Sequence, residues 1–303
     1  MKPTLLILAA GMGSRYGGLK QLDAIGPNGE TIIDYSVYDA IRAGFGKAVF
    51  VIREHFANDF KAKVTDKFKD QIEVAFAYQE IDTPIEGLEK VPEREKPWGT
   101  AHAMLVAADL VKTPFAVLNA DDFYGASAFQ QIAEFLTTDA APDHYGMVGY
   151  VLQNTLSANG SVSRGVADMN ADHYLNTVVE RHKIQRIDGT ISHELEGAKH
   201  PLSDEALVSM NFWGFHPNIF EEIRTQFLEF VKENPDNPRA EFYIPLVANR
   251  MVQNGQVKLK VLTSRDQWYG VTYQEDKPDV LAAMERLSAE GQYPSPLWKP
   301  VAV

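Results

Sequence analysis

A short apolar run followed at once by a glycine-rich loop is the feature that most constrains this chain. Residues Thr4–Leu8 are mostly apolar, which predicts a strand buried in a parallel sheet. Four glycines follow within residues 11–18, and Arg15 and Lys20 lie in or just after this loop. Such a loop at the carboxyl end of a strand can bring backbone N–H groups close to phosphate oxygens, and arginine and lysine add charged donors. The arrangement predicts an α/β fold with a site for a nucleoside triphosphate.

The composition permits a large folded core and excludes several kinds of chemistry. The 303 residues are 45% hydrophobic and include no cysteine, which excludes disulfides, thiolate metal sites and cysteine nucleophiles. The net charge of −12 argues against a surface for nucleic acid or anionic membranes, although a few local cations and a metal can still hold a nucleotide. No apolar stretch reaches the length of a membrane span and nothing near Met1 resembles a signal peptide, so we expect a cytoplasmic protein. The sequence does not determine an oligomeric state.

Different kinds of phosphate-binding loop compete for the residues after the first strand. A Walker loop requires Ser or Thr after its lysine, but Gln21 follows Lys20. A dinucleotide-binding loop requires a third glycine where this chain has Tyr16. Residues 8–15 instead follow the pattern Leu-x-x-Gly-x-Gly-x-Arg, and Lys-Gln-Leu comes after it at residues 20–22. This pattern resembles the loop of the sugar-1-phosphate nucleotidyltransferases, also called nucleotide-sugar pyrophosphorylases.

The resemblance implies a Rossmann-like α/β fold of three layers around a mixed, mostly parallel central sheet. The first half of the chain supports this, because its candidate strands and helices alternate as in sheets covered on both faces. The expected strands are Thr4–Leu8, Lys47–Ile52, Ile72–Tyr78, Phe115–Asn119, Gly146–Val151, Val162–Met169, Leu175–Lys183, Leu207–Phe215 and Lys258–Leu262. The expected helices are Asp34–Ala43, Asn58–Phe68, Thr100–Asp109, Ser127–Leu136, Asn218–Lys232, Ile244–Gln253 and Lys277–Glu290. We expect one nucleotidyltransferase domain over residues 1–303, with a nucleotide-binding half (1–135) and a sugar-phosphate-binding half (140–275).

Two adjacent carboxylates, Asp121 and Asp122, follow the expected strand Phe115–Asn119. The carboxyl ends of parallel strands meet at the edge where α/β proteins bind ligands, and carboxylate oxygens suit Mg²⁺, which bridges phosphates. Either aspartate has the alternative role of stabilising the following turn. The stretch resembles the metal-binding stretch of the family, and this match makes Asp121 the expected Mg²⁺ ligand, with Asp122 beside the site or in the turn.

The resemblance also places residues against the nucleotide. Residues 97–103 resemble a Gly-Thr-Ala segment that lies along the base and ribose, and Gln79 stands where uridine- and thymidine-using members have a glutamine that contacts the pyrimidine edge. Gln79 has the alternative of an ordinary polar strand end. The expected nucleotide contacts are Leu8, Ala10, Gly11, Gly13, Gln79, Gly99 and Thr100. The charged loop Glu80–Lys96 is either a disordered excursion or a flap over the nucleotide.

The second half of the chain is expected to bind the sugar phosphate. Residues 175–183 resemble a Glu-Lys element in which glutamate holds sugar hydroxyls and the cation holds the phosphate. Glu180 matches the glutamate, Arg181 takes the place of the lysine, and Lys183 is a second candidate cation. Gly165 resembles a glycine that lets the sugar approach the backbone, and Asn211 is a candidate partner of a hydroxyl. A solvated charged strand face and an asparagine paired with backbone are the ordinary structural alternatives.

The chain departs from the family pattern late in the sequence. Many members carry a second metal aspartate in a Trp-x-Asp-x-Gly-Thr stretch, and here Gly270 stands where that aspartate would fall. Asp276 is the candidate replacement, with the N-cap of the final helix as its competing role. Asp266 is also nearby in sequence, but a polar turn explains it better.

Together the resemblances imply a metal-dependent enzyme that transfers a nucleotidyl group from an NTP to a sugar 1-phosphate and releases pyrophosphate. Arg15, Lys20 and Asp121 are the expected catalytic residues, Mg²⁺ the expected cofactor, and neither nucleic acid nor membrane an expected partner. The attacking phosphate is already anionic, so positioning and charge stabilisation suffice for catalysis. The alternatives are a non-sugar acceptor, such as phosphocholine or a molybdenum cofactor, and a non-catalytic regulatory protein that binds a nucleotide or sugar nucleotide.

Overall fold

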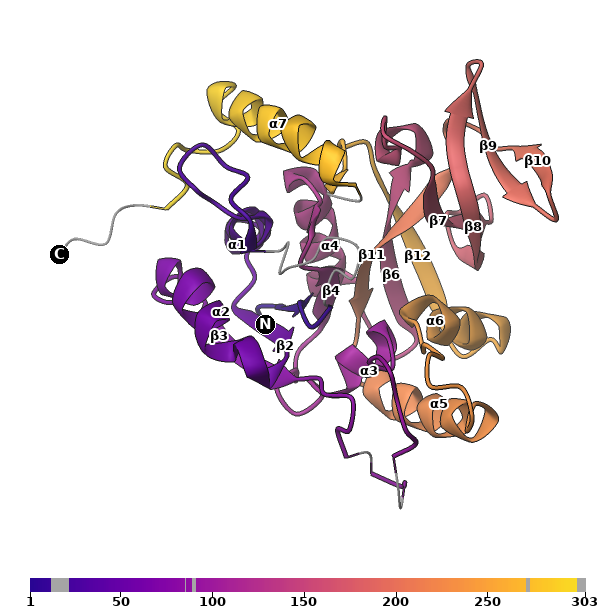
Figure 1. The fold of residues 1–303 in the computed structure, drawn as a ribbon. Helices are drawn as coiled ribbons and strands as arrows, with labels where there is room; N and C mark the ends of the chain where they lie inside the picture. The colour runs from indigo at the N-terminus through magenta and orange to yellow at the C-terminus, as the bar shows by residue number, and fades with distance from the viewer. Residues whose placement is uncertain (12–21, 85, 89–90, 271–272, 299–303) are drawn as a thin grey trace.

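The structure, a computed structural model, describes residues 1–11, 22–84, 86–88, 91–270 and 273–298. The expected site residues Gly13, Arg15 and Lys20 lie outside these ranges, so their roles stay predictions. Helices cover both faces of a mixed central sheet, which gives the layered arrangement in Figure 1. The expected α/β class, with a mixed sheet and a parallel core, is confirmed.

The amino-terminal part of the sheet is parallel. Its strands lie in the order β3 (Glu73–Tyr78), β2 (Lys47–Ile52), β1 (Thr4–Leu8) and β4 (Phe115–Asn119). The leucines and isoleucine inside β1 are fully buried, as expected for a strand covered on both faces. Leu8 pairs with Asn119 in the register, so the carboxyl ends of β1 and β4 lie side by side at one edge of the sheet.

The remainder of the sheet is largely antiparallel. Beyond β4 the order continues with β11 (Leu207–Phe215), β7 (Val162–Met169), β8 (Leu175–Ile187), β9 (Thr190–Leu195) and β10 (Ala198–Pro201). Beside β11 lie β6 (His144–Val151) and β12 (Lys258–Ser264), which are parallel to each other. Strands β8, β9 and β10 extend away from the helical layers at the upper right of Figure 1.

The helices divide between two hydrophobic layers. One layer contains α1 (Ile32–Arg42), α2 (Ala57–Val64) and α4 (Ala126–Thr138), and the other contains α3 (Thr100–Leu105), α5 (Ile219–Glu233) and α6 (Ile244–Gln253). Short 3₁₀ helices lie at Glu54–Phe56, Thr65–Lys67, Leu152–Thr155 and Gln274–Asp276. Among the described residues, no helix is both long enough and apolar enough to cross a membrane.

A third, smaller hydrophobic cluster joins residues around α1 to the carboxyl-terminal part of the described chain. It forms around helix α7 (Lys277–Ala289), which packs near the start of α1 and against a two-stranded sheet. That sheet pairs β5 (Asp122–Phe123) with β13 (Tyr269–Gly270), and Gly270 lies opposite Asp122. The late segment that departs from the family pattern is therefore a direct neighbour of the paired aspartates.

Most of the expected helices and strands are present, but several begin or end at other residues than expected. The helix expected over Asn58–Phe68 ends at Val64 and continues only as a 3₁₀ turn, and the helix expected over Thr100–Asp109 ends at Leu105. Strand β8 continues four residues past Lys183, because it pairs with β9. The sequence analysis did not predict β9 and β10, and β10 is exposed along its whole length.

The described part of the charged loop Glu80–Lys96 packs against α5 and the segment before α6. Arg94 is buried over the ring of Trp98, with its guanidinium carbon 3.6 Å from the ring centroid, and donates to the backbone carbonyls of Asn237 and Ala240. Lys96 pairs with Glu241 at 2.5 Å. These contacts attach the end of the loop to the segment between α5 and α6.

Candidate functional site

A cavity of about 670 Å³ lies beside β11, the strand between β4 and β7 in the central sheet. Strand β11 pairs with β7 at Val208 and Ser209, and with β4 from Trp213 onward. Between these pairs the register shifts, and Asn211 adopts a φ of +63°. The sheet opens at this point, so ligands can reach the carboxyl end of β4, the kind of place where α/β sheets bind them.

Residues from three separate strands of the expected acceptor site meet in this cavity. Gly165 on β7, Glu180 on β8 and Asn211 on β11 all line it. Gly165 and Glu180 are register partners, which puts both on the same face of the sheet. A Cβ at Gly165 would lie 2.9 Å from Val178 Cγ1 and 3.7 Å from Glu180 Oε2, so the glycine keeps the floor of the cavity open beside the carboxylate.

The expected phosphate-binding cations do not line the cavity. Arg181 follows Glu180 on the strand and therefore points to the opposite face of β8. Lys183 lies further along, with a φ of +52° at a register shift, and its ammonium pairs with Glu194 of β9 at 2.7 Å. The roles of Arg181 and Lys183 in binding phosphate stay predictions.

A buried cation that sequence reasoning did not single out does line the cavity. Arg164 is 9% exposed and donates to the carbonyls of Ser163 and Thr155, while its buried Nε finds no hydrogen-bond partner among the described residues. Its guanidinium lies over the ring of Trp268, 4.7 Å from the centroid. Burial lowers the pKa of Arg164 to about 10, against the opposing influence of Asp122, Glu180 and Asp276. The only sequence signal was its position beside Gly165.

A chain of hydrogen bonds joins β11 to Asp122 through the end of β4. Asn211 Nδ2 donates to Asn119 Oδ1 at 2.7 Å, and Asn119 Nδ2 donates to Asp122 Oδ2 at 2.9 Å. The Tyr124 hydroxyl also donates to the carbonyl of Met210 at 2.9 Å. Asn211 therefore holds the end of β4 in place, a role that is compatible with a further contact to a ligand because its side chain lines the cavity.

The paired aspartates occupy different positions. Asp121 lies in the turn directly after β4, whereas Asp122 begins β5 and lines the cavity. The carbonyl of Leu8 accepts a hydrogen bond from the N–H of Ala120 at 3.1 Å, which ties the start of the glycine-rich loop to this turn. The expected phosphate loop and the expected metal ligand thus begin at neighbouring strand ends.

The place of a second metal aspartate is filled by packing. A Cβ at Gly270 would lie 2.6 Å from Trp268 Cη2 and 3.0 Å from Asp122 Oδ1, so no side chain fits there without movement. Asp276 accepts hydrogen bonds from Ser157 Oγ at 2.7 Å, Asn159 Nδ2 at 2.9 Å and the N–H of Tyr273 at 2.8 Å. It occupies the N-cap position of α7 without capping it through its side chain.

Asp266, the other nearby carboxylate, stabilises the start of α4. Its Oδ2 accepts from the N–H and hydroxyl of Ser127 at 3.1 and 2.8 Å, and from the N–H of Ala128 at 3.3 Å. These are N–H groups of the first helical turn, which lack partners within the helix. The carboxylate thus serves as a cap supplied from a distant part of the chain.

Of the residues expected to contact the nucleotide, Gln79 and Gly99 are joined by a hydrogen bond, and Thr100 lines the cavity. Gln79 Nε2 donates to the carbonyl of Gly99 and to His102 Nδ1, both at 3.1 Å. Burial lowers the pKa of His102 to about 4, so the ring is neutral at pH 7 and its Nδ1 can accept this bond. Both amide N–H groups of Gln79 therefore donate to other groups of the protein. If Gln79 contacts a nucleotide base as expected, its side-chain carbonyl oxygen is the atom that remains to accept a hydrogen bond from the base. Thr100 lines the cavity and, with its hydroxyl, holds the N–H of Ile244 at 3.1 Å.

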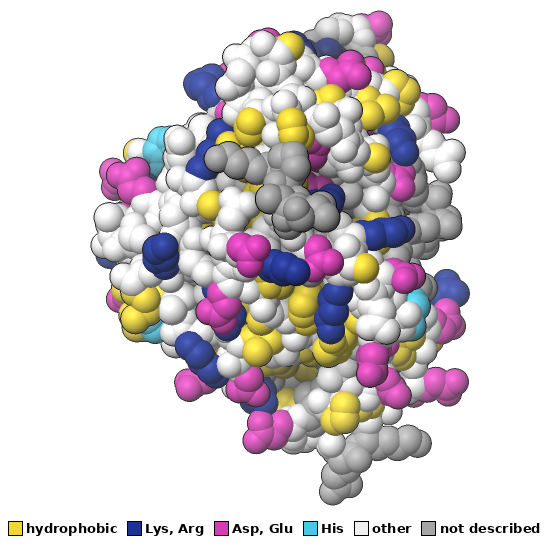
Figure 2. Space-filling view, turned by 90° about the vertical axis from the view of Figure 1, so that its left-hand side faces the viewer, with side chains coloured by type: hydrophobic (Ala, Val, Ile, Leu, Met, Phe, Trp, Pro, Cys, Tyr) yellow, Lys and Arg dark blue, Asp and Glu magenta, His cyan; other side chains and the backbone are white. Residues whose placement is uncertain are grey.

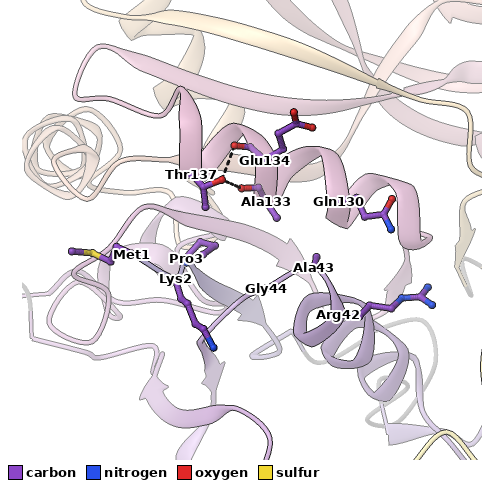
Figure 3. Close-up of a pocket in the computed structure, with 10 residues that line it drawn as sticks. All are labelled: Met1, Lys2, Pro3, Arg42, Ala43, Gly44, Gln130, Ala133, Glu134 and Thr137. Atoms are coloured by element: carbon purple, nitrogen blue, oxygen red, sulfur yellow. Dashed lines mark hydrogen bonds between the residues drawn. The ribbon is translucent and has the colours of Figure 1, made fainter.

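A second cavity, of about 650 Å³, lies away from these residues (Figure 3). It is formed by the residues before β1, the end of α1 and one side of α4. Thr137 in its wall is hydrogen bonded to the carbonyls of its own helix. The cavity adjoins the amino end of β1, the end of a parallel sheet at which α/β proteins do not usually bind ligands.

On the face of the molecule that carries α2 and β3, basic side chains (Lys and Arg) are interspersed with acidic ones (Asp and Glu) (Figure 2).

A family model described as nucleotidyl transferase matches residues 4–275. The chain belongs to the nucleotidyl transferase family, and it is an enzyme. The match includes the glycine-rich loop, the paired aspartates and every strand that contributes to the main cavity. No curated protein matches the chain.

Solved structures share the fold of this nucleotidyl transferase at low sequence identity. A protein described as a glucose-1-phosphate thymidylyltransferase from Bacillus anthracis aligns with a TM-score of 0.62 at 14% identity, over 93% of this chain and 94% of that one. The inositol-1-phosphate CTP transferase from T. maritima aligns with the same score and identity, over 93% and 96%. A UDP-glucose pyrophosphorylase complexed with UDP-glucose aligns at 0.58 and 16% identity, over 93% and 98%. These likenesses establish the fold.

Proposed function

We propose that this nucleotidyl transferase uses a divalent metal to transfer a nucleotidyl group from an NTP to a sugar 1-phosphate, with release of pyrophosphate. We also propose that residues 1–303 act as one domain, in which residues 1–135 bind the nucleotide and residues 140–275 the sugar phosphate. The pairing of β4 with β11 supports the single domain, because it joins the two halves in one sheet beside the cavity.

One observation carries the proposal. Gly165, Glu180 and Asn211 come from three strands, yet they line the same cavity as Thr100 and Asp122. The acceptor candidates therefore lie next to a nucleotide candidate and to the end of β4. A transfer reaction requires this proximity, because the two substrates must be held with their reacting phosphates in contact.

The residues present fit a magnesium ion. Among the residues that the structure describes, no group of three or more His, Cys, Asp or Glu side chains forms a metal-binding cluster by itself. Mg²⁺ usually binds proteins through one or two carboxylates and takes its other ligands from phosphates and water. Asp121 is the residue we expect to hold it, with Asp122 beside it. The bound ion would supply positive charge at the transferring phosphate.

The chain's own groups would bind and orient the substrates. We expect the loop N–H groups and Arg15 to hold the departing phosphates, and Lys20 to lie against the phosphate that is attacked. We expect Glu180 to accept hydrogen bonds from sugar hydroxyls, which its position in the cavity supports. Partial burial raises the pKa of Glu180, although His182 and Arg164 oppose this effect. No protein nucleophile is required, because the acceptor phosphate carries the attacking oxygen.

The test is a matrix of nucleotides and acceptors read by pyrophosphate release. Each of ATP, CTP, GTP, UTP and dTTP is incubated with a panel of sugar 1-phosphates in the presence of Mg²⁺, with phosphocholine as a non-sugar acceptor and with EDTA as the metal-free control. We expect release for at least one NTP and sugar 1-phosphate pair, abolished by EDTA. Release with phosphocholine alone would favour the non-sugar acceptor. Nucleotide binding without release in any combination would favour the regulatory alternative.

A further inference from the structure

The last described segment of the chain, residues 292–298, crosses α1 and the loop before it. The carbonyl of Gln292 accepts a hydrogen bond from Arg42 at 3.0 Å, and Ser295 Oγ accepts one from Asn28 Nδ2 at 2.8 Å. At the other end of the segment, Trp298 Nε1 donates to Asp34 Oδ1 at 2.9 Å. These contacts fix the segment along a stretch of chain that follows the glycine-rich loop.

Buried carboxylates on this stretch receive donors from the segment. Glu30, Asp34 and Asp39 are 5%, 0% and 1% exposed. Leu297 N–H donates to Glu30 at 3.1 Å, and the Tyr293 hydroxyl donates to Asp39 at 2.7 Å. A buried carboxylate without partners is costly, so the segment and α1 depend on each other.

Tyr293 also contacts the turn that carries the paired aspartates. Its ring lies 6.0 Å from that of Phe123, the residue directly after Asp122, and 5.0 Å from that of Tyr35 on α1. All three rings are buried in the small cluster around α7. Tyr293 is therefore in contact with α1 through its hydroxyl and with β5 through its ring.

Helix α7 adds a connection closer to the glycine-rich loop. Lys277 at its start pairs with Asp23 at 2.8 Å, and Ile25 packs in the same cluster as Val280 and Met284. The family match ends at residue 275, so α7 and the following segment lie beyond the matched region. We call residues 277–298 the C-terminal clamp.

We propose that the C-terminal clamp sets the position of the Asp121–Asp122 turn relative to the residues that follow the glycine-rich loop, with Tyr293 as the positioning residue. The inference rests on the proposed function, since it assumes that the loop and the turn hold one metal-bound nucleotide. The clamp contacts the residues that follow the loop through Asp23 and Ile25, and it contacts β5 through Phe123, which lies in the same hydrophobic cluster as Ile25. A small displacement of one relative to the other would weaken metal binding and slow transfer, because catalysis by positioning is sensitive to shifts of about 1 Å.

The test compares Tyr293→Leu with Trp298→Phe in the full-length protein. Both variants lose a hydrogen bond from the clamp to a buried aspartate on α1, but only Tyr293→Leu also loses an aromatic contact to Phe123; the Trp298 ring packs on Tyr38 and Phe68 instead. Mn²⁺ binding in the presence of each NTP is followed by electron paramagnetic resonance, and thermal unfolding and turnover are measured in parallel below the unfolding transition. We expect Tyr293→Leu to weaken Mn²⁺ binding by roughly 10-fold and to lower kcat. Trp298→Phe should lower only the unfolding temperature.

Equal Mn²⁺ affinities in the two variants would overturn the positioning role and leave a purely structural one. If Tyr293→Leu does not fold, Phe123→Leu removes the same aromatic contact from the other side and should also weaken Mn²⁺ binding. Unchanged binding in that variant would also overturn the proposal. Because metal binding is measured apart from turnover, an absence of pyrophosphate release in the wild type would count against the proposed reaction and not against the clamp.

Discussion

The parallel and antiparallel parts of the sheet bring their candidate site residues together in different ways. On the parallel side, the glycine-rich loop and the paired aspartates each follow a buried strand directly, and β1 and β4 are neighbours. On the antiparallel side, Gly165, Glu180 and Asn211 lie within strands and meet only through the pairing of β7 with β8 and β11. The first arrangement follows from strand order, whereas the second depends on register.

The dependence on register explains why Glu180 and its neighbour Arg181 differ in position. Side chains alternate between the faces of a regular strand, so Glu180 and Arg181 point to opposite faces of β8. Glu180 lines the cavity; Arg164 also lines it, although its register partner is Arg181, because β7 is irregular beside this residue. The following predictions test this difference between the two sides.

The largest effect is expected on the parallel side, at Arg15. Arg15→Ala should lower kcat/KM by roughly 10²-fold or more, as expected when a preorganised charge at a leaving group is lost. Steady-state pyrophosphate release measures the effect, and circular dichroism checks that the variant is folded. Turnover close to that of the wild type in a folded variant would rule out this role for Arg15.

The next largest effect concerns metal binding and distinguishes the role of Asp121 from that of Asp122. Asp121→Asn keeps the shape of the side chain and removes its charge, so we expect the Mg²⁺ requirement to rise by roughly 10- to 100-fold. Asp122→Asn is the matched control and should have a smaller effect, because Asp122 is engaged by Asn119 and Tyr124. Titration of activity with Mg²⁺ measures both. Identical titrations for Asp121→Asn and the wild type would remove Asp121 from the metal site.

On the antiparallel side we expect an effect on one substrate only. Glu180→Gln should raise the KM for the sugar 1-phosphate by about 10-fold and leave the KM for the NTP unchanged, since the lost interactions are with the acceptor. Arg181→Gln is the adjacent control and should change either KM by less, because the side chain faces away from the cavity. A weaker NTP affinity in Glu180→Gln would contradict the division into two halves. A larger effect at Arg181 would show that β8 changes register or orientation on binding.

The smallest effect concerns stability and lies outside both sites. Burial raises the pKa of Asp39 from its ordinary 3.8 to about 7; Arg42 and the Tyr293 hydroxyl lower it, and Asp266 raises it. Folding therefore favours the protonated form, and the contribution of Asp39 to stability is greatest below about pH 4 and is lost as the pH rises towards 7. Urea unfolding at pH 5 and pH 8 should show that Asp39→Asn becomes more stable relative to the wild type at the higher pH. An equal difference at both pH values would contradict the raised pKa.

Much of the fold could be predicted from the sequence, because apolar runs and helical periodicity are local signals. The bounds of β1, β2, β4, β7, β11 and α6 agree with the expectation. Strand β10 lacks an apolar pattern because it lies exposed at the edge of the sheet, and β9 has only two apolar residues, Ile191 and Leu195, among its six. The sequence nevertheless contains a turn signal in the pairs Asp188-Gly189 and Glu196-Gly197. In the structure all four residues have positive φ, as two-residue hairpin turns of this kind require.

The candidate site was only partly accessible to sequence reasoning. Gly165, Glu180 and Asn211 were found through resemblance to a family, and the structure brings them to one cavity. Arg164 was missed, because a buried arginine in a strand carries no local signal and its partners come from Thr155 and Trp268, far apart in sequence. The bonds of Asp266 to the start of α4 also join distant residues, so its capping role could not be predicted.

The close packing of Trp268 against Gly270 affects which substitutions position 270 can accept. An aspartate at position 270 would meet the Trp268 ring and approach the carboxylate of Asp122, so Gly270→Asp alone combines overpacking with like-charge repulsion. A smaller residue at 268 would relieve this contact, and it would also leave the Arg164 guanidinium without the ring beneath it. A second acidic ligand at this position therefore comes at the expense of packing around Trp268, and we expect Gly270→Asp to be tolerated better once a smaller residue stands at 268.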